Sequence, residues 1–318
     1  MDGIAGYALR RLLLLPLTLL VVSLGTFYIT RWGPGDPIST YSGVYRDEEA
    51  FDRARANYGL DKPVHEQYVI WLRQVVTEGD FGPSFTFRDR DVTEIIFPKM
   101  WVSMRLGLYA FIIMFLVGIP AGVYAATRQG TWVDPSVIAF FLVFQSVPVL
   151  VVVPMLVLVL SVHLGWVPPG GFDGLFSRSM IIPTIALSLP GIAGVARLAR
   201  AATLQTMNDE FVRTARAKGL DEFTVVTRHV FRNSVLPVMT TVVGLSMVGL
   251  LEGAFFTEIL LGIPGIGSFM YEAVRGRDYN VILAVVVIIS TAFVLANLAV
   301  DLLLIWIDPR IRASGTVR

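Results

Sequence analysis

Cysteine is absent from the chain of 318 residues, and charged residues are scarce. Without cysteine there are no disulfides, no thiolate zinc or iron–sulfur sites and no cysteine nucleophile. Asp, Glu, Lys and Arg make up 16% of the residues, where about 25% is usual in soluble domains. The 26 basic and 25 acidic side chains nearly cancel, so nothing suggests binding to a nucleic acid.

Residues that support catalysis are also few. His65, His163 and His229 lie far apart with no HExxH pattern, so no metal site is indicated. None of the three lysines lies in a GxxxxGK(S/T) phosphate loop, so this chain should not hydrolyse ATP. Ser268 lacks the G-x-S-x-G spacing of a hydrolase nucleophile. The sequence therefore predicts neither a catalytic site nor a cofactor on this chain.

Apolar residues are abundant instead, at 54% of the chain, and the mean hydropathy is +0.66. Six segments are long and apolar enough to cross a bilayer: residues 9–30, 102–126, 137–163, 181–199, 235–257 and 281–307. The first resembles a cleaved signal peptide, but its apolar run is too long for one and no small-residue cleavage site follows. We therefore expect a retained helix, and an all-α membrane protein with six transmembrane helices.

Basic residues are concentrated on alternate connections between these segments. Arginines flank the start of the first segment and the end of the second, seven basic residues lie between positions 197 and 232, and three arginines close the chain. If the six segments alternate in direction, all these sites share one side of the membrane. The positive-inside rule then places both termini in the cytoplasm.

Residues 32–100 follow the N-terminal helix (1–31), precede a five-helix core (101–318), and are expected to fold as an extracytoplasmic cap. Within them, residues 63–78 place apolar side chains at helical spacing before Gly79 and Gly82-Pro83 end the helix. Residues 47–58 also read as helix. A helix in the membrane interface is the alternative for residues 63–78, but the mixed charges of its polar face favour a cap.

Segment 201–234, between the fourth and fifth apolar segments, predicts two short helices. Asn208 or Asp209 can cap the first helix, which carries Phe211, Val212 and Ala215. Gly219 suits the left-handed residue that ends a helix, because glycine has no Cβ to clash there.

Asp221 can cap the second helix, whose residues Phe223, Val226 and Val230 are expected on one face. Two short helices joined at an angle would make a compact knob suited to docking a soluble partner. An ordinary solvated loop is the alternative on composition alone.

Motifs along nearly the whole chain bear on this choice. ARAKGL (215–220), followed by RHVFRNSVLP (228–237), resembles the cytoplasmic loop of ABC importer permeases, in particular their dipeptide, oligopeptide and nickel branch. Eight further strings match in the family's order: GPGDP (33–37), GLDKP (59–63), QYVIWL (67–72), GDFGPSF (79–85), LGWVPPGG (164–171), IPGIG (263–267), RDYNV (277–281) and DPRIR (308–312). Arg213, Thr214 and Ala215 replace the generic Glu-Ala-Ala, as is usual in the peptide branch. The long first outer connection and the DPRIR tail resemble the first, B-type, permease of a pair.

The resemblance implies the partners of this chain. They are a second homologous permease, two P-loop ATPase subunits that bind ATP and magnesium, and an extracytoplasmic solute-binding protein. It implies that segment 201–234 couples the permease to the ATPases. The residues expected in that role are Glu210, Phe211, Arg213, Ala215, Gly219, Leu220, Asp221 and Phe223. Di- or oligopeptides are the expected substrates, with nickel complexes or oligosaccharides as alternatives.

Glu252 is an ionisable residue inside the fifth apolar segment, which makes it a candidate for the translocation pathway. Its alternative roles are pairing with a partner-subunit side chain or protonation. The small-residue pairs 118–122 (GIPAG) and 249–253 (GLLEG) allow close helix packing, with packing alone the favoured interpretation.

Two other classes of function stay open at this stage. A self-sufficient channel or secondary transporter would often show an inverted repeat, and none is evident here. A membrane scaffold would use the outer cap and the inner knob to hold partners.

Overall fold

The computed structural model describes residues 4–32, 56, 59–87, 90–174 and 176–307, and for residues 4–12, 240–253 and 300–307 it describes the backbone alone. These residues are mostly helical and contain no β-strand beyond a single bridge between Pro83 and Asp91. The predicted helix at 47–58, apart from residue 56, and the GPGDP and DPRIR motifs lie outside the described residues.

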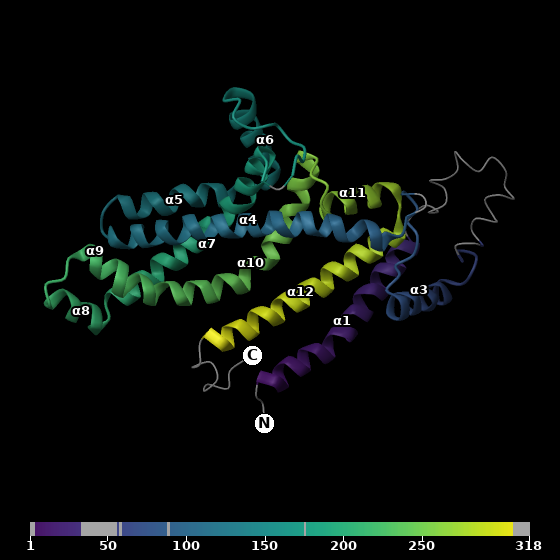
Figure 1. The fold of residues 1–318 in the computed structure, drawn as a ribbon, viewed down its shortest axis with the longest axis horizontal. Coiled ribbons are helices and arrows are strands. Elements are labelled where there is room, and N and C mark those ends of the chain that lie inside the picture. Colours follow the sequence, from purple (N-terminus) through teal and green to yellow (C-terminus); the bar gives the residue numbers. More distant parts are fainter. Residues whose placement is uncertain (1–3, 33–55, 57–58, 88–89, 175, 308–318) are drawn as a thin grey trace. The chain divides into compact units, whose positions relative to one another are not determined.

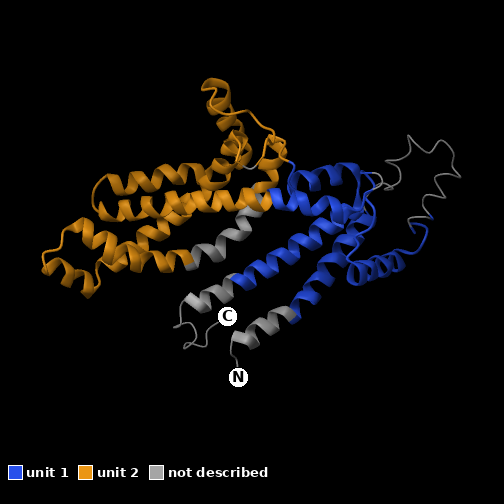
Figure 2. Ribbon diagram, viewed as in Figure 1, with its two compact units in different colours: residues 1–102, 264–318 blue, residues 103–263 orange. Residues whose placement is uncertain are grey.

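The chain divides into two compact units. Residues 1–102 and 264–318 form unit 1, and residues 103–263 form unit 2 (Figure 2). The segment 201–234 therefore lies wholly in unit 2, whereas the described part of the outer connection lies in unit 1.

Four described helices are long and apolar enough to cross a membrane: α1 (Ile4–Trp32), α4 (Val92–Thr127), α7 (Ile181–Met207) and α12 (Tyr279–Ile307) (Figure 1). Two pairs of helices pass the same test together. They are α5 (Val133–Ser146) with α6 (Val149–Leu156) and η2 (Val157–His163), and the last turns of α10 (Phe231–Leu261) with α11 (Ile266–Gly276). The predicted all-helical, membrane-embedded class is thus confirmed, with four to six spans among the described residues.

The third predicted span is not one straight helix. Helix α5 ends at Ser146, Val147 is extended (φ −94°, ψ 125°), and α6 begins after Pro148 at an angle of 104° to α5. Pro148 favours this break, since the residue before a proline is biased away from the helical region. Pro154 and Pro190, by contrast, lie inside continuous helices.

Two further spans have different ends from those predicted. Helix α4 starts at Val92 and has 36 residues, which correspond to about 54 Å of helix, well beyond the bilayer core. Helix α10 continues to Leu261, so Glu258, just beyond the predicted segment 235–257, lies in its last turns. Glu258 is fully buried, and its Oε1 accepts a hydrogen bond of 2.5 Å from the Ser103 hydroxyl of α4. Glu258 is therefore a buried helical residue and not part of the connection that follows the fifth segment.

Helix α7 packs against α5 and α10 in unit 2 and, at two glycines, against α4. A Cβ atom on Gly118 would lie 2.7 Å from the Val195 Cβ, and one on Gly122 would lie 2.7 Å from the Ala199 Cβ. The GIPAG motif is therefore a close α4–α7 contact, as the spacing of its glycines predicts.

Helix α3 (Val64–Glu78) packs against α1 in unit 1, and α1 packs against α12. Pro63 precedes α3, and Gly79, with a φ of +68°, ends it, as predicted from the sequence. Tyr68 and Trp71 of α3 are buried in an aromatic cluster with Phe27 of α1 and with Phe81.

Two of the sequence motifs meet at the start of α12. The Asp278 carboxylate, fully buried, accepts hydrogen bonds from the Ser84 hydroxyl (2.6 Å) and the Thr86 N–H (2.9 Å). It also accepts one from the Val281 N–H (3.3 Å), which caps α12. Asn280 donates to the Pro83 carbonyl at 2.9 Å. GDFGPSF and RDYNV are thus two sides of one structural contact.

Candidate functional site

The candidate site is the connection between α7 and α10. Helix α7 runs to Met207, α8 covers Glu210–Ala217, and α9 (Glu222–Thr224) continues through η4 (Val225–Val230) into α10. Figure 1 shows α8 and α9 at the far end of the α7 and α10 helices. The first predicted short helix is α8, whereas the second is not separate, because α9 and η4 run on without a break into α10.

The turn between the two helices is built on Gly219. Its φ is +76°, its N–H donates to the Arg216 carbonyl at 2.9 Å, and the Leu220 N–H donates to the Ala215 carbonyl at 3.4 Å. These are the paired bonds of a Schellman motif, which needs a left-handed residue after the helix. The expected position of Gly219 at the helix end is therefore confirmed.

Two side-chain interactions hold the second helix. The Asp221 Oδ2 accepts from the Thr224 N–H at 2.9 Å, so the predicted cap is present. Arg216 of α8 donates to Glu222 of α9 through Nε (3.1 Å) and Nη2 (2.7 Å), a bidentate pair across the Gly219 turn. At the start of α8, Asp209 occupies the N-cap position, but its side chain makes no capping bond.

These contacts shift three acid–base equilibria. Hydrogen bonds from the Thr224 side chain and N–H lower the pKa of Asp221. The hydrogen bonds between Arg216 and Glu222 lower the pKa of Glu222 and raise the pKa of Arg216. All three groups are therefore held in their charged forms at neutral pH.

The two helices enclose a small apolar core. Val212, Ala215, Val225 and Val230 are buried there, with Met207 packed against them. Ala215, predicted to couple to a partner, thus faces the interior of the segment. Beside this core, the buried Thr203 hydroxyl of α7 donates to the Ser234 hydroxyl of α10 at 3.4 Å.

The other predicted coupling residues face outward. Glu210, Phe211, Arg213, Gly219, Leu220, Asp221 and Phe223 are all exposed. The exposed fraction of Phe223 is 78%, so the expectation that it shares one face with the buried Val230 is wrong. Val225 and Val230, not Phe223, supply the apolar contacts of this helix.

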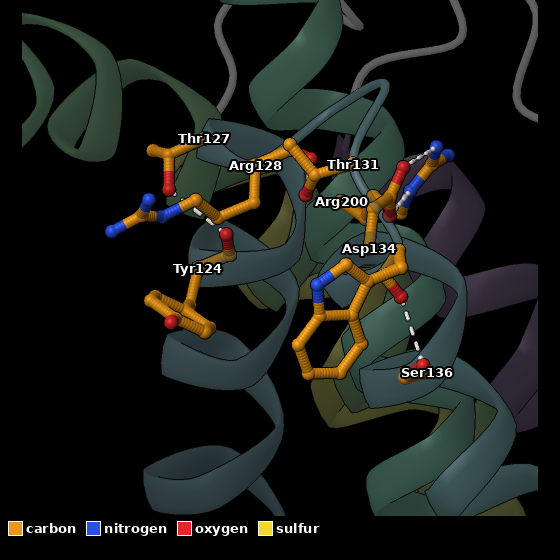
Figure 3. A network of polar contacts seen from close by, with 8 residues as sticks. Tyr124, Thr127, Arg128, Thr131, Asp134, Ser136 and Arg200 are labelled. Atoms are coloured by element: carbon orange, nitrogen blue, oxygen red, sulfur yellow. Dashed lines mark hydrogen bonds and ion pairs between the residues drawn. The ribbon is translucent and has the colours of Figure 1, made fainter.

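A second polar contact lies near the same end of α7 (Figure 3). Arg200 donates from Nε and Nη2 to the two carboxylate oxygens of Asp134, at 2.5 and 2.6 Å. The Asp134 side chain is 8% exposed and that of Arg200 is 32% exposed. This ion pair joins the first turn of α5 to α7, seven residues before α7 ends.

The sequence prediction did not include this pair. Asp134 follows a turn at residues 128–132, in which the Thr131 hydroxyl donates to the Arg128 carbonyl and the Arg128 guanidinium lies over the Tyr124 ring (Figure 3). The sequence did contain a signal for this pair, because Asp134 and Arg200 both adjoin connections that the positive-inside count places on the same side of the membrane.

Glu252, the candidate pathway residue, belongs to the part of α10 whose side chains lie outside the described residues. The described residues contain no group of three or more His, Asp or Glu side chains that could hold a metal ion.

Comparison with known proteins places these features in context. Residues 118–313 match the family described as "Binding-protein-dependent transport system inner membrane component", and residues 4–88 match the corresponding N-terminal family. The oligopeptide transport system permease protein OppB of Salmonella typhimurium is 36% identical over 96% of this chain and 99% of its own length. The same protein of Haemophilus influenzae is 33% identical with the same coverage. The dipeptide permease DppB of Alkalihalophilus pseudofirmus is also 33% identical over 96% of this chain.

A similar fold occurs in a solved structure. An inward-facing structure of the MetNI methionine ABC transporter contains a chain that is 19% identical and aligns with a TM-score of 0.56, over 68% of this chain and 97% of that one. At this identity the likeness concerns the fold alone.

Proposed function

The chain belongs to the family of binding-protein-dependent transport system inner membrane components, and from that premise we propose how it works as a permease. It is a permease of the peptide class of ATP-driven importers, similar over nearly its full length to oligopeptide and dipeptide permeases. We propose that it forms half of the pathway for di- or oligopeptides, and that a second homologous permease forms the other half.

The proposed topology has six spans with both termini in the cytoplasm. It counts α5, α6 and η2 as one broken span and includes α10. The alternation of basic connections supports it. Segment 201–234 and the ion pair of Arg200 with Asp134 then lie on the cytoplasmic side.

The proposed partners supply what the chain lacks. Two P-loop ATPases bind ATP and magnesium, and an extracytoplasmic binding protein delivers the peptide. Energy from ATP would reach the pathway as motion of whole helices, since the chain has no phosphate-binding loop of its own.

Segment 201–234 is the proposed contact with the ATPases. The observation that carries this proposal is Phe223, which is 78% exposed on an element fixed by its own apolar core, the Gly219 turn and the Arg216–Glu222 pair. An exposed aromatic side chain on a rigid support is a typical anchor of a protein interface. Phe211 and Leu220, about 40% exposed, would extend the apolar contact. Glu210, Arg213 and Asp221 would form its polar rim.

The test is recovery of the ATPases with the tagged chain from its native membrane in mild detergent. Phe223→Ala is expected to weaken their binding by about 30-fold, since truncating an anchor residue costs about 2 kcal/mol. Phe176→Ala is the matched control, because Phe176 is 96% exposed and lies on a connection proposed to face outward. Equal recovery of ATPases with both variants would contradict the proposed docking role.

Glu252 is proposed to line the pathway, where its carboxylate would attract the amino end of a peptide. Glu252→Gln is expected to lower the transport rate while leaving recovery of the ATPases unchanged. Unchanged substrate affinity and transport would exclude this role, and loss of the complex would point instead to pairing with the partner subunit.

A further inference from the structure

Helix α3 has two apolar faces, of which unit 1 covers one. Tyr68 and Trp71 are buried in the unit 1 core, with Val64 and Val75 packed beside them. Val69 and Val76 are 63% and 74% exposed. Seven residues separate them, which is two helical turns, so they form a stripe along the helix next to the buried face.

The position of α3 along α1 indicates how deep α3 lies relative to the membrane surface. Figure 1 shows α3 beside the C-terminal part of α1, which ends at Arg31 and Trp32. The rings of Tyr68 and Trp71 lie 5.3 and 6.1 Å from the ring of Phe27. Phe27 precedes Trp32 by five residues, or about 7.5 Å of helix rise. The Tyr68 hydroxyl reaches further, to 3.0 Å from the Ser23 hydroxyl.

Trp32 marks where α1 leaves the apolar phase. It is 78% exposed, adjoins Arg31, and ends an apolar window that begins at Leu13. Tryptophan and arginine at the end of a span are typical of the membrane interface. A helix about 7.5 Å below that level lies at the boundary of headgroups and acyl chains, where interfacial amphipathic helices insert by about 5–10 Å.

The remaining side chains of α3 fit this position. Most of its other exposed side chains are polar, namely His65, Glu66, Arg73, Gln74, Thr77 and Glu78, and Ile70, 41% exposed, lies among them. On α1, Val21 and Ile29 are 60% and 74% exposed, as expected for a helix in contact with lipid. An amphipathic helix that packs beside a membrane span and has polar side chains and an exposed apolar stripe suits a lipid surface.

We propose that α3 lies in the membrane interface at the C-terminal end of α1, with Val69 and Val76 in contact with lipid acyl chains. This chooses the interfacial alternative for residues 63–78 over the extracytoplasmic cap. It requires only that α1 crosses the membrane, so it is independent of the docking role proposed for segment 201–234. As a consequence, helix α3 would anchor the connection between α1 and α4 to the bilayer surface beside α1.

The experiment uses single-cysteine variants of the full chain in the assembled importer, because the chain has no cysteine of its own. Val69→Cys and Val76→Cys report the stripe, and Arg73→Cys and Thr77→Cys are matched controls on the polar face. In the first experiment each variant reacts with a membrane-impermeant maleimide, and the maleimide label on this chain is quantified after gel separation. In the second, each variant carries a fluorophore on its cysteine and is placed in phosphatidylcholine nanodiscs, with or without bromine at shallow acyl positions.

The stripe variants are expected to react with the maleimide at least about tenfold more slowly than the controls, since burying a valine-sized side chain is worth such a factor. Their fluorescence should be quenched by brominated lipid, whereas that of the controls should not. Reaction rates equal to those of the controls would place α3 in water and overturn the proposal. Slow reaction without quenching would overturn it in favour of a protein partner on the stripe. The two stripe positions are independent, so failure of one variant to assemble leaves the other as the test.

Discussion

The ion pair of Arg200 with Asp134 predicts an unequal response to removing its two partners. Arg200→Met would leave the Asp134 carboxylate, 8% exposed, without the guanidinium that donates both of its hydrogen bonds. Asp134→Asn would leave a guanidinium that is 32% exposed and within reach of water. Arg200→Met therefore leaves a buried charge without its partner, whereas Asp134→Asn leaves a charge that water can reach.

The magnitudes follow from this difference in burial. Breaking a buried pair by removing one partner costs about 3–5 kcal/mol, and Arg200→Met is expected at that level. Asp134→Asn should cost about 1–3 kcal/mol, the usual range for a buried hydrogen-bonding group that loses its best partner. The double variant Asp134→Leu with Arg200→Met removes both charges, so its cost should fall well below the sum of the single changes.

The assay is thermal unfolding of the detergent-solubilised chain followed by tryptophan fluorescence, with each variant placed in a double-mutant cycle. Arg197→Met is the control, because Arg197 lies three residues earlier on α7 and is exposed, with a 3.3 Å hydrogen bond to Gln145. It should cost less than about 1 kcal/mol. If Arg200→Met is no worse than Arg197→Met, or if the double variant is strictly additive, the pair does not hold α5 to α7.

Three further predictions concern backbone packing, coupling and pH. Gly122→Val should destabilise the chain by about 1–3 kcal/mol in the same unfolding assay, because its side chain would overlap α7, whereas Gly107→Ala, with open space around the glycine, should be tolerated. Gly219→Val should lower peptide transport per ATP hydrolysed in reconstituted vesicles, since a β-branched residue is strained at a φ of +76°; unchanged coupling would contradict a fixed turn. The lowered pKa of Glu222 means that its pair with Arg216 adds stability that is complete above the ordinary glutamate pKa of 4.5 and is lost as the pH falls through the lowered value. Protection from hydrogen exchange in segment 201–234, taken relative to the intrinsic exchange rate at each pH, should therefore fall below about pH 4.5, and Arg216→Gln should reduce that fall.

Features set by local sequence were predictable. The apolar runs gave the helices that can cross a membrane, and Gly219 and Asp221 gave the turn and the cap of segment 201–234, because such bonds join residues a few positions apart. The break at Pro148 could have been predicted by the same local reasoning. It was not, because a single apolar run covers both sides of the proline and hydropathy carries no information on a bend in the helix.

Features set by distant residues were not predictable. Asp134 and Arg200 are 66 residues apart, and Ser84 and Asp278 are 194 apart, so no spacing rule connects them. The different burial of Phe223 and Val230, which were expected on one face, was missed for a related reason. Its helix is too short to show a periodic face, and burial there depends on the side on which α8 packs.

The contacts that shape segment 201–234 have one more consequence. The Arg216–Glu222 pair spans six residues and the Asp221 cap spans three, and the apolar core draws on Met207 and Val230 at the two ends of the segment. The shape of segment 201–234 is therefore determined mainly by contacts among its own residues. With the docking role proposed for this segment, we expect that exchanging residues 201–234 between related permeases would change the choice of ATPase while the membrane helices and their substrate stay the same.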